Sequence, residues 1–135
     1  MYKRQKQHCA NAEKVVKFLE SQKKVKNVIY PTNHQGEIKE RAKKYMQGGY
    51  GSLVGMDVGT KEAGAKFIDN LKMLYHVANI GDARSLAIHP ATTTHSQLTE
   101  QEMLAAGVTP GYVRLSIGIE HPDDIVADIK QALAA

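Results

Sequence analysis

The chain has 135 residues, which is enough for one domain built around one hydrophobic core. Its composition, 42% hydrophobic and 24% charged, is that of an ordinary globular protein and argues against disorder. One cysteine, Cys9, excludes a disulfide framework, and no apolar run is long enough to span a membrane. The polar first residues also differ from a signal peptide, so we expect a cytoplasmic protein.

Charge is unevenly distributed along the chain. Residues 1–50 carry 12 Lys and Arg against 4 Glu, whereas residues 51–135 carry 6 Lys and Arg against 10 Asp and Glu. A basic half is one signature of nucleic-acid binding. Here the basic residues are spaced along predicted amphipathic helices and are not gathered with aromatic residues. This spacing favours Lys-rich outer helix faces and argues against nucleic acid as a partner.

Hydrophobic periodicity predicts alternating helices and strands. The predicted helices cover residues 4–22, 37–46 and 61–75, a short stretch from Thr99 to Gly107, and the stretch from Pro122 onward. The predicted strands cover residues 25–30, 53–58 and the segment around Arg114. The short apolar runs at residues 77–80 and 86–88 suit strands or irregular extended pieces. Short strands and helices in similar number predict an α/β (α+β) fold, a two-layer sandwich whose sheet is covered by helices on one face.

Local signals support three of these helices. Ile38, Ala42 and Tyr45 fall on one side of the second helix. Thr99 and Glu102 have the spacing of a capping box, which marks a helix start. The third helix has a full apolar stripe that predicts a core face: Gly64, Phe67, Ile68, Leu71 and Leu74.

Arg114 is a charged residue inside an apolar strand. Strand alternation places Val113, Leu115 and Ile117 on one face and Arg114 and Ser116 on the other. A guanidinium on the polar face has the planar fork that binds a carboxylate. The alternative is an ordinary solvated arginine on an open sheet.

A polar loop at residues 89–95 (HPATTTH) places three hydroxyls between two imidazoles. Such a loop can line a binding site, or it can be a turn whose hydroxyls bond its own backbone. The six histidines of the chain lack the spacing of metal ligands, so we expect no metal site.

Three motifs together resemble a known enzyme family. Residues 79–86 (NIGDARSL), 89–95 (HPATTTH) and 114–120 (RLSIGIE) are similar to the C-terminal part of the Cys/Met-metabolism enzymes that use pyridoxal phosphate, and most resemble O-acetylhomoserine sulfhydrylases. The resemblance covers essentially the whole chain. It implies the small C-terminal domain of a fold-type I enzyme, with a mainly antiparallel sheet, formed by residues 1–135 as a single domain of a larger enzyme. The family's usual assembly is a homotetramer.

The resemblance also implies roles for individual residues. Arg114 would bind the α-carboxylate of a small amino-acid substrate. Asn79 stands where relatives often have a serine that lines the carboxylate pocket, and Thr94 matches a threonine near the substrate. Glu120 matches an acid at the end of the family motif and is interpreted as structural. No catalytic residue is expected in this chain.

Several parts of the family's active site have no counterpart in this sequence. The Schiff-base lysine motif, the phosphate-binding glycine loop and the aspartate beside the cofactor ring are missing, so we expect pyridoxal phosphate in the parent enzyme and none bound to this chain. The expected parent reaction replaces the acetate of O-acetylhomoserine with a sulfur nucleophile, and this chain alone is expected to be inactive. Alternatives are a related γ-synthase or lyase, or a non-catalytic binding module. Self-association through an uncovered sheet face is also expected of an isolated domain.

Overall fold

A computed structural model describes residues 2–135. Its helices are α1 (Tyr2–Glu20), α2 (Gly36–Tyr45), α3 (Lys61–Asn70), α4 (Glu100–Ala105) and α5 (Pro122–Ala134), with short 3-10 turns η1 (Pro31–Asn33) and η2 (Pro90–Thr92). Its strands are β1 (Asn27–Ile29), β2 (Leu53–Asp57), β3 (Tyr75–His76), β4 (Leu86–Ile88) and β5 (Tyr112–Ser116).

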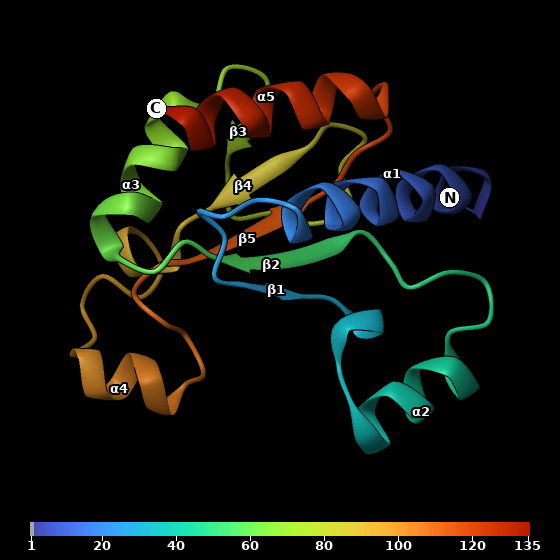
Figure 1. The fold of residues 1–135 in the computed structure, drawn as a ribbon, viewed down its shortest axis with the longest axis horizontal. Helices are drawn as coiled ribbons and strands as arrows, with labels where there is room; N and C mark the ends of the chain where they lie inside the picture. Colours follow the sequence, from blue (N-terminus) through green and yellow to red (C-terminus); the bar gives the residue numbers. More distant parts are fainter. Residues whose placement is uncertain (1) are drawn as a thin grey trace.

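The five strands form one sheet in the order β1-β2-β5-β4-β3. Three of the pairings are antiparallel, and only β3 and β4 run parallel. Helices α1, α3 and α5 cover one face of this sheet, whereas α2 and α4 stand away from it at opposite ends of the molecule (Figure 1). The predicted two-layer fold, with a mainly antiparallel sheet and helices on one face, is therefore confirmed.

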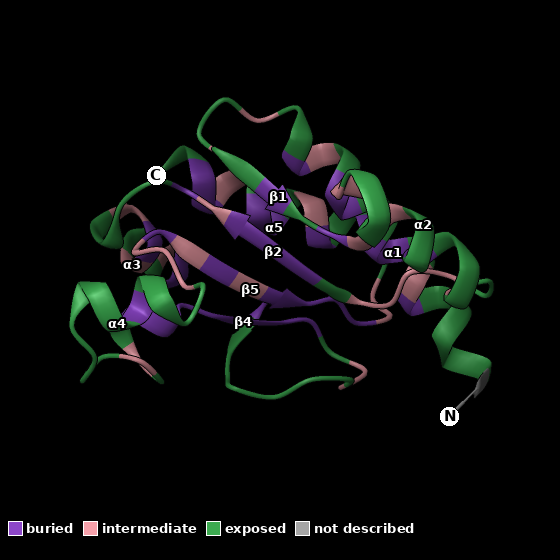
Figure 2. Ribbon diagram, turned by 90° about the horizontal axis from the view of Figure 1, so that it is seen from below, coloured by how far each residue is buried: buried purple, intermediate pink, exposed green. Residues whose placement is uncertain are grey.

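The hydrophobic core lies between the sheet and helices α1, α3 and α5. Val113, Leu115 and Ile117 are fully buried in it, as the alternation of the Arg114 strand predicts. Helix α5 contributes Ile125 and Ile129, which are also fully buried. Figure 2 shows this buried layer running along β2 and β5. Because β5 is the middle strand, its position is fixed from both sides and from the helix layer.

The third helix is shorter than its apolar stripe predicts. It ends at Asn70, and the next residues turn away because Asp128 of α5 binds their backbone. Asp128 accepts hydrogen bonds from the N–H groups of Lys72 (2.9 Å), Met73 (2.8 Å) and Leu74 (3.0 Å). Of the two interpretations of residues 77–80, a strand or an irregular extended piece, the structure shows the second, since the strand here is β3 at Tyr75–His76.

Helix α2 does not bury the face that its sequence pattern indicates. Ala42 is buried, but Ile38 is 56% exposed and Tyr45 is 73% exposed. The helix packs chiefly beside η1, outside the sandwich (Figure 1). Its surface charges pair along the helix, with Arg41 bonded to Glu37 and Lys43 to Glu40. Of the three residues that share one side of this helix, Ala42 alone is therefore buried.

The capping box at the start of α4 is confirmed. The Thr99 hydroxyl accepts a hydrogen bond from the Glu102 N–H (3.3 Å), and the Glu102 carboxylate accepts one from the Thr99 N–H (2.8 Å). Hydrogen bonds from the backbone and hydroxyl of Thr99 lower the pKa of Glu102, because they stabilise its charged form.

Among residues 2–135, no helix combines the length and apolarity needed to cross a membrane.

Candidate functional site

Arg114 lies in the middle strand of the sheet, on the face that helices α1, α3 and α5 leave uncovered. It sits opposite Gly55 of β2 on one side and Ile88 of β4 on the other. The side chain is half-buried. No carboxylate of residues 2–135 forms an ion pair with its guanidinium. An unpaired guanidinium held at a fixed position on a sheet is able to bind a carboxylate through two parallel hydrogen bonds.

The aromatic ring of Tyr112 lies beside Arg114 and over Gly55. A Cβ atom at Gly55 would come within 2.7 Å of the ring, so only a glycine leaves room for Tyr112 here. Burial raises the pKa of the Tyr112 hydroxyl, and the nearby positive charge of Arg114 opposes that rise. The phenol is therefore neutral near pH 7, and Arg114 gains no counter-charge from it.

Ser116 is less open than strand alternation predicts. It shares the face of Arg114, yet it is almost fully buried, because the loop between β3 and β4 folds over this end of the sheet. The loop is fixed there by the Gly81 N–H, which donates a hydrogen bond to the Ser116 hydroxyl (3.2 Å). The face around Arg114 is therefore bounded by a loop on the β4 side.

Glu120 fixes the far end of the same loop. Its carboxylate accepts hydrogen bonds from the N–H (2.6 Å) and the hydroxyl (2.9 Å) of Ser85. The Ser85 hydroxyl in turn accepts a bond from the Gly118 N–H (2.9 Å). From α1, the Asn11 amide donates to the carbonyls of Gly118 (3.1 Å) and Glu120 (2.8 Å). Sequence reasoning missed Ser85 and Asn11, since no local pattern marks bonds that span 33 or 35 residues for Ser85 and 107 or 109 for Asn11.

Asn79 and Thr94 both lie on exposed loops. The Asn79 side chain accepts a hydrogen bond from the N–H of Ile80 (2.8 Å), and the Thr94 hydroxyl contacts Nδ1 of His95 (2.8 Å). Asn79 belongs to the loop before β4 and Thr94 to the segment after it, next to the strand that carries Ile88 opposite Arg114. Within the described part of the chain, no hydrogen bond joins any two of the three predicted substrate-binding residues.

His89 and the two threonines nearest to it form a closed hydrogen-bond set. The carbonyl of Pro110 can only accept, so Nε2 of the fully buried His89 donates to it (2.8 Å) and Nδ1 accepts from the Thr92 hydroxyl (3.0 Å). The Thr93 hydroxyl donates to the His89 carbonyl (2.9 Å). The interpretation of this loop as a turn that satisfies its own backbone therefore holds for Thr93, whereas the Thr92 hydroxyl contacts the His89 ring and lies 3.2 Å from the His89 carbonyl.

Burial lowers the pKa of His89 below its ordinary value of 6.5. The hydrogen bond to Pro110 acts in the opposite direction, and electrostatic repulsion from Lys61 and His76 lowers the pKa further. The unfolded chain then binds a proton more readily than the folded chain. We expect the free energy of unfolding to have its full value above about pH 6.5. As the pH falls below about 6.5, it decreases by at most about 1.4 kcal/mol per pH unit, the slope for one proton.

The measurement is urea unfolding at several pH values between 5 and 8, for the native chain and for His89→Gln. Glutamine keeps a donor for the Pro110 carbonyl and does not titrate in this range. A smaller loss of stability at low pH in the variant is the expected result. Equal pH dependence in the two chains would contradict the assignment.

The family of the chain follows from comparison with known proteins. A family profile described as "Cys/Met metabolism PLP-dependent enzyme" matches residues 1–134. The chain belongs to this family. It is 49% identical over 132 residues to the O-acetyl-L-homoserine sulfhydrylase of Leptospira meyeri, covering 96% of this chain and 30% of the relative. It is 43% identical over 133 residues to the L-methionine gamma-lyase of Fusobacterium nucleatum subsp. polymorphum, covering 96% of this chain and 33% of the relative.

A solved structure from the same family confirms the fold. The structure of a putative O-acetylhomoserine (thiol)-lyase from Campylobacter jejuni superposes with a TM-score of 0.89 at 41% identity, covering 98% of this chain and 32% of that one. The chain thus spans about a third of the length of the relatives it matches. The Campylobacter protein is described as holding N'-pyridoxyl-lysine-5'-monophosphate, which is the cofactor attached to a lysine.

The residues of this chain do not fit that cofactor. Each lysine lies on the surface or, for Lys39, is half-buried, and none lies on the Arg114 strand. Asp128 is the one buried carboxylate among residues 2–135, and its oxygens are occupied by the backbone after α3, on the helix side of the sheet. The same residues contain no cluster of three His, Cys, Asp or Glu able to hold a metal ion.

Proposed function

We propose that this chain supplies the part of an O-acetylhomoserine sulfhydrylase-like enzyme that binds the carboxylate of the amino-acid substrate. The observation that carries the proposal is the half-buried, unpaired Arg114 guanidinium on the uncovered face of the sheet. Arg114 would clamp the α-carboxylate through both of its terminal nitrogens and so fix the orientation of the substrate. Asn79 and Thr94, on the loops that flank β4, would line the same pocket.

In the proposed reaction, acetate leaves the γ-carbon of O-acetylhomoserine and a sulfur nucleophile takes its place. Pyridoxal phosphate supplies the electron sink when it is bound, and the residues that hold it would lie outside this stretch of sequence. The contribution of this chain is positional. A fixed carboxylate holds the reacting carbon at one place and one angle, which lowers the entropy cost of the chemical step.

The test is to replace Arg114 with alanine, and separately with lysine, in the complete enzyme of which these residues form a part. Loss of a charge-assisted double hydrogen bond, worth about 1.5 to 3 kcal/mol, is expected to lower kcat/KM for O-acetylhomoserine by about tenfold to a hundredfold, mainly through KM. Lysine is expected to restore little, since it lacks the planar fork. Arg41→Ala is the matched control, because Arg41 is an exposed arginine paired within α2.

An unchanged KM for the amino acid in both Arg114 variants would overturn the carboxylate-binding role. A second candidate reaction is the γ-elimination of a sulfur amino acid, favoured by the 43% identity to an L-methionine gamma-lyase. Assays with O-acetylhomoserine plus sulfide, and with methionine alone, distinguish the two. Both reactions use an α-amino acid, so the role proposed for Arg114 is common to them.

A further inference from the structure

The tyrosine beside Arg114 has a hydroxyl that no group of residues 2–135 uses. Tyr112 is half-buried, and none of the hydrogen bonds within the described chain includes its hydroxyl. The carboxylate opposite it in register belongs to Asp57, whose two oxygens accept bonds from the Gly59 N–H (2.7 Å) and the Thr109 hydroxyl (2.6 Å). The phenol of Tyr112 is therefore a donor that stays available on the uncovered face of the sheet.

The ring of Tyr112 brings this hydroxyl next to Arg114. A Cβ atom at Gly55 would lie 2.7 Å from the ring and 3.1 Å from the hydroxyl oxygen. Gly55 is the register partner of Arg114, and the Cβ positions of such a pair are about 4.5 to 5.5 Å apart. The hydroxyl and the base of the Arg114 side chain thus stand side by side. The Cβ atom of Ile29, 3.1 Å from the same point over Gly55, limits the ring on its other side.

Both groups are donors at neutral pH. Burial raises the pKa of the Tyr112 hydroxyl, so the phenol keeps its proton, and the guanidinium of Arg114 forms no ion pair within residues 2–135. A carboxylate has about four sites that accept hydrogen bonds, and the fork of an arginine occupies two of them. A carboxylate held by Arg114 therefore has room for a third donor.

We propose that Tyr112 is a second substrate-binding residue, whose hydroxyl donates a hydrogen bond to the α-carboxylate held by Arg114. This inference rests on the function proposed above for Arg114. The hydroxyl approaches the carboxylate from the β2 side, while the loop fixed to Ser116 bounds the β4 side. Gly55 is part of the arrangement, because any side chain there would displace the ring.

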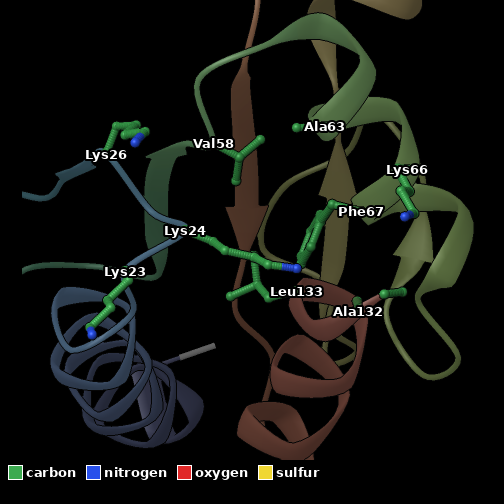
Figure 3. A pocket seen from close by; sticks show the side chains of 10 residues that line it. Lys23, Lys24, Lys26, Val58, Ala63, Lys66, Phe67, Ala132 and Leu133 are labelled. Carbon is green, nitrogen blue, oxygen red and sulfur yellow. The ribbon is translucent and has the colours of Figure 1, made fainter.

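A positively charged concavity on the helix side of the sheet lacks donors that converge in this way. Its volume is about 350 Å³, and Lys24, Lys26 and Lys66 line it together with Phe67. Figure 3 shows Lys26 and Lys66 on opposite sides of it, and Phe67 is only 2% exposed. These lysines offer a carboxylate no planar pair of donors. Lys66→Gln is therefore a suitable control for charge removed away from Arg114.

The test measures inhibition of the complete enzyme, of which these residues form a part, by norvaline and by butylamine, which is norvaline without its carboxylate. Tyr112→Phe removes the hydroxyl and keeps the ring. It is expected to raise the inhibition constant of norvaline about threefold to tenfold, as the loss of one hydrogen bond does, and to leave that of butylamine unchanged. The KM for O-acetylhomoserine is expected to rise by a similar factor with little change in kcat.

Tyr45→Phe is the matched control, because Tyr45 is exposed on α2, and it is expected to change neither inhibition constant, as is Lys66→Gln. An unchanged inhibition constant for norvaline in Tyr112→Phe would overturn the proposal. So would an equal rise for norvaline and butylamine, which indicates a change of shape and not the loss of a bond to the carboxylate.

Arg114→Ala in the same assay separates this inference from the proposed function. If Arg114→Ala weakens inhibition by norvaline and Tyr112→Phe does not, the role of Tyr112 alone is wrong. If neither variant weakens it, the carboxylate site itself is wrong. Weaker inhibition by norvaline in both variants, with butylamine unaffected by Tyr112→Phe, is the result expected of a shared site.

Discussion

Replacing Asp128 with alanine is expected to lower the free energy of unfolding by about 3 to 5 kcal/mol, because several buried or partly buried donors lose their acceptor at once. Three of these donors are the consecutive backbone N–H groups of residues 72–74. A fourth is the side-chain amide of Gln131 (3.0 Å). Together they fix the place where α3 ends and the chain turns into β3.

The charge of Asp128 is part of this effect. Burial alone would raise the pKa of the carboxyl, but the bonds from the three N–H groups and Gln131 outweigh burial and hold the pKa below its ordinary value of 3.8. The stability that Asp128 provides is therefore complete above that value. It is lost as the pH falls through the lower pKa of the folded state.

Urea unfolding at pH 7 measures the loss, with Asp69→Ala as the matched control. Asp69 is an exposed aspartate near the end of α3, and its removal is expected to change stability by less than about 0.5 kcal/mol. Asp128→Asn keeps one carbonyl oxygen and is expected to lie between the two. If Asp128→Ala is as stable as Asp69→Ala, the carboxylate does not hold the turn.

Asp128 also explains why the sequence predicts some elements and misses others. The stripe of Phe67 and Ile68, the capping box of α4 and the alternation around Arg114 are local patterns, so each element was found with its correct type. The end of α3 depends on a carboxylate 54 to 56 residues away. No periodicity within residues 61–75 contains that information.

In the candidate site, too, the sequence predicts local features and misses those that depend on distant residues. Alternation places Arg114 on the uncovered face of the sheet, but it cannot reveal that a loop covers Ser116 on that face. The cross-link from Glu120 to Ser85 joins two segments 35 residues apart, and each of them is unremarkable in isolation. Only the long motifs of the family resemblance led to the prediction that these segments belong to one site.

The second substitution with a large expected effect on stability is at Gly118, whose N–H bonds the Ser85 hydroxyl. Its backbone runs so close to the loop before β4 that a Cβ atom would lie 2.6 Å from the carbonyl carbon of Arg84, and closer still to the Ala83 oxygen and the Glu120 carboxylate. Two of these three neighbours are backbone atoms that cannot rotate away. Gly118→Ala is therefore expected to cost about 2 to 3 kcal/mol, as overpacking of a rigid site does.

The same change is expected to disturb the loop that borders Arg114. Pushing Ala83 and Arg84 away breaks the bond from the Ile119 N–H to the Ala83 carbonyl (2.8 Å) and loosens the hold of Glu120 on Ser85. In the complete enzyme, we expect a higher KM for the amino-acid substrate together with the lower stability. Arg114→Ala, which removes no packed backbone contact, is expected to raise KM without a comparable loss of stability.

Gly48→Ala provides the matched control for Gly118→Ala. An added methyl group at Gly48 meets no atom within 4 Å, and its φ is not positive, so alanine is tolerated there. Thermal unfolding of the two variants compares the same glycine-to-alanine change at a crowded position and at an open one. Equal melting temperatures would mean that the backbone at Gly118 has room to move, and the loop beside Arg114 would then not be fixed by close packing.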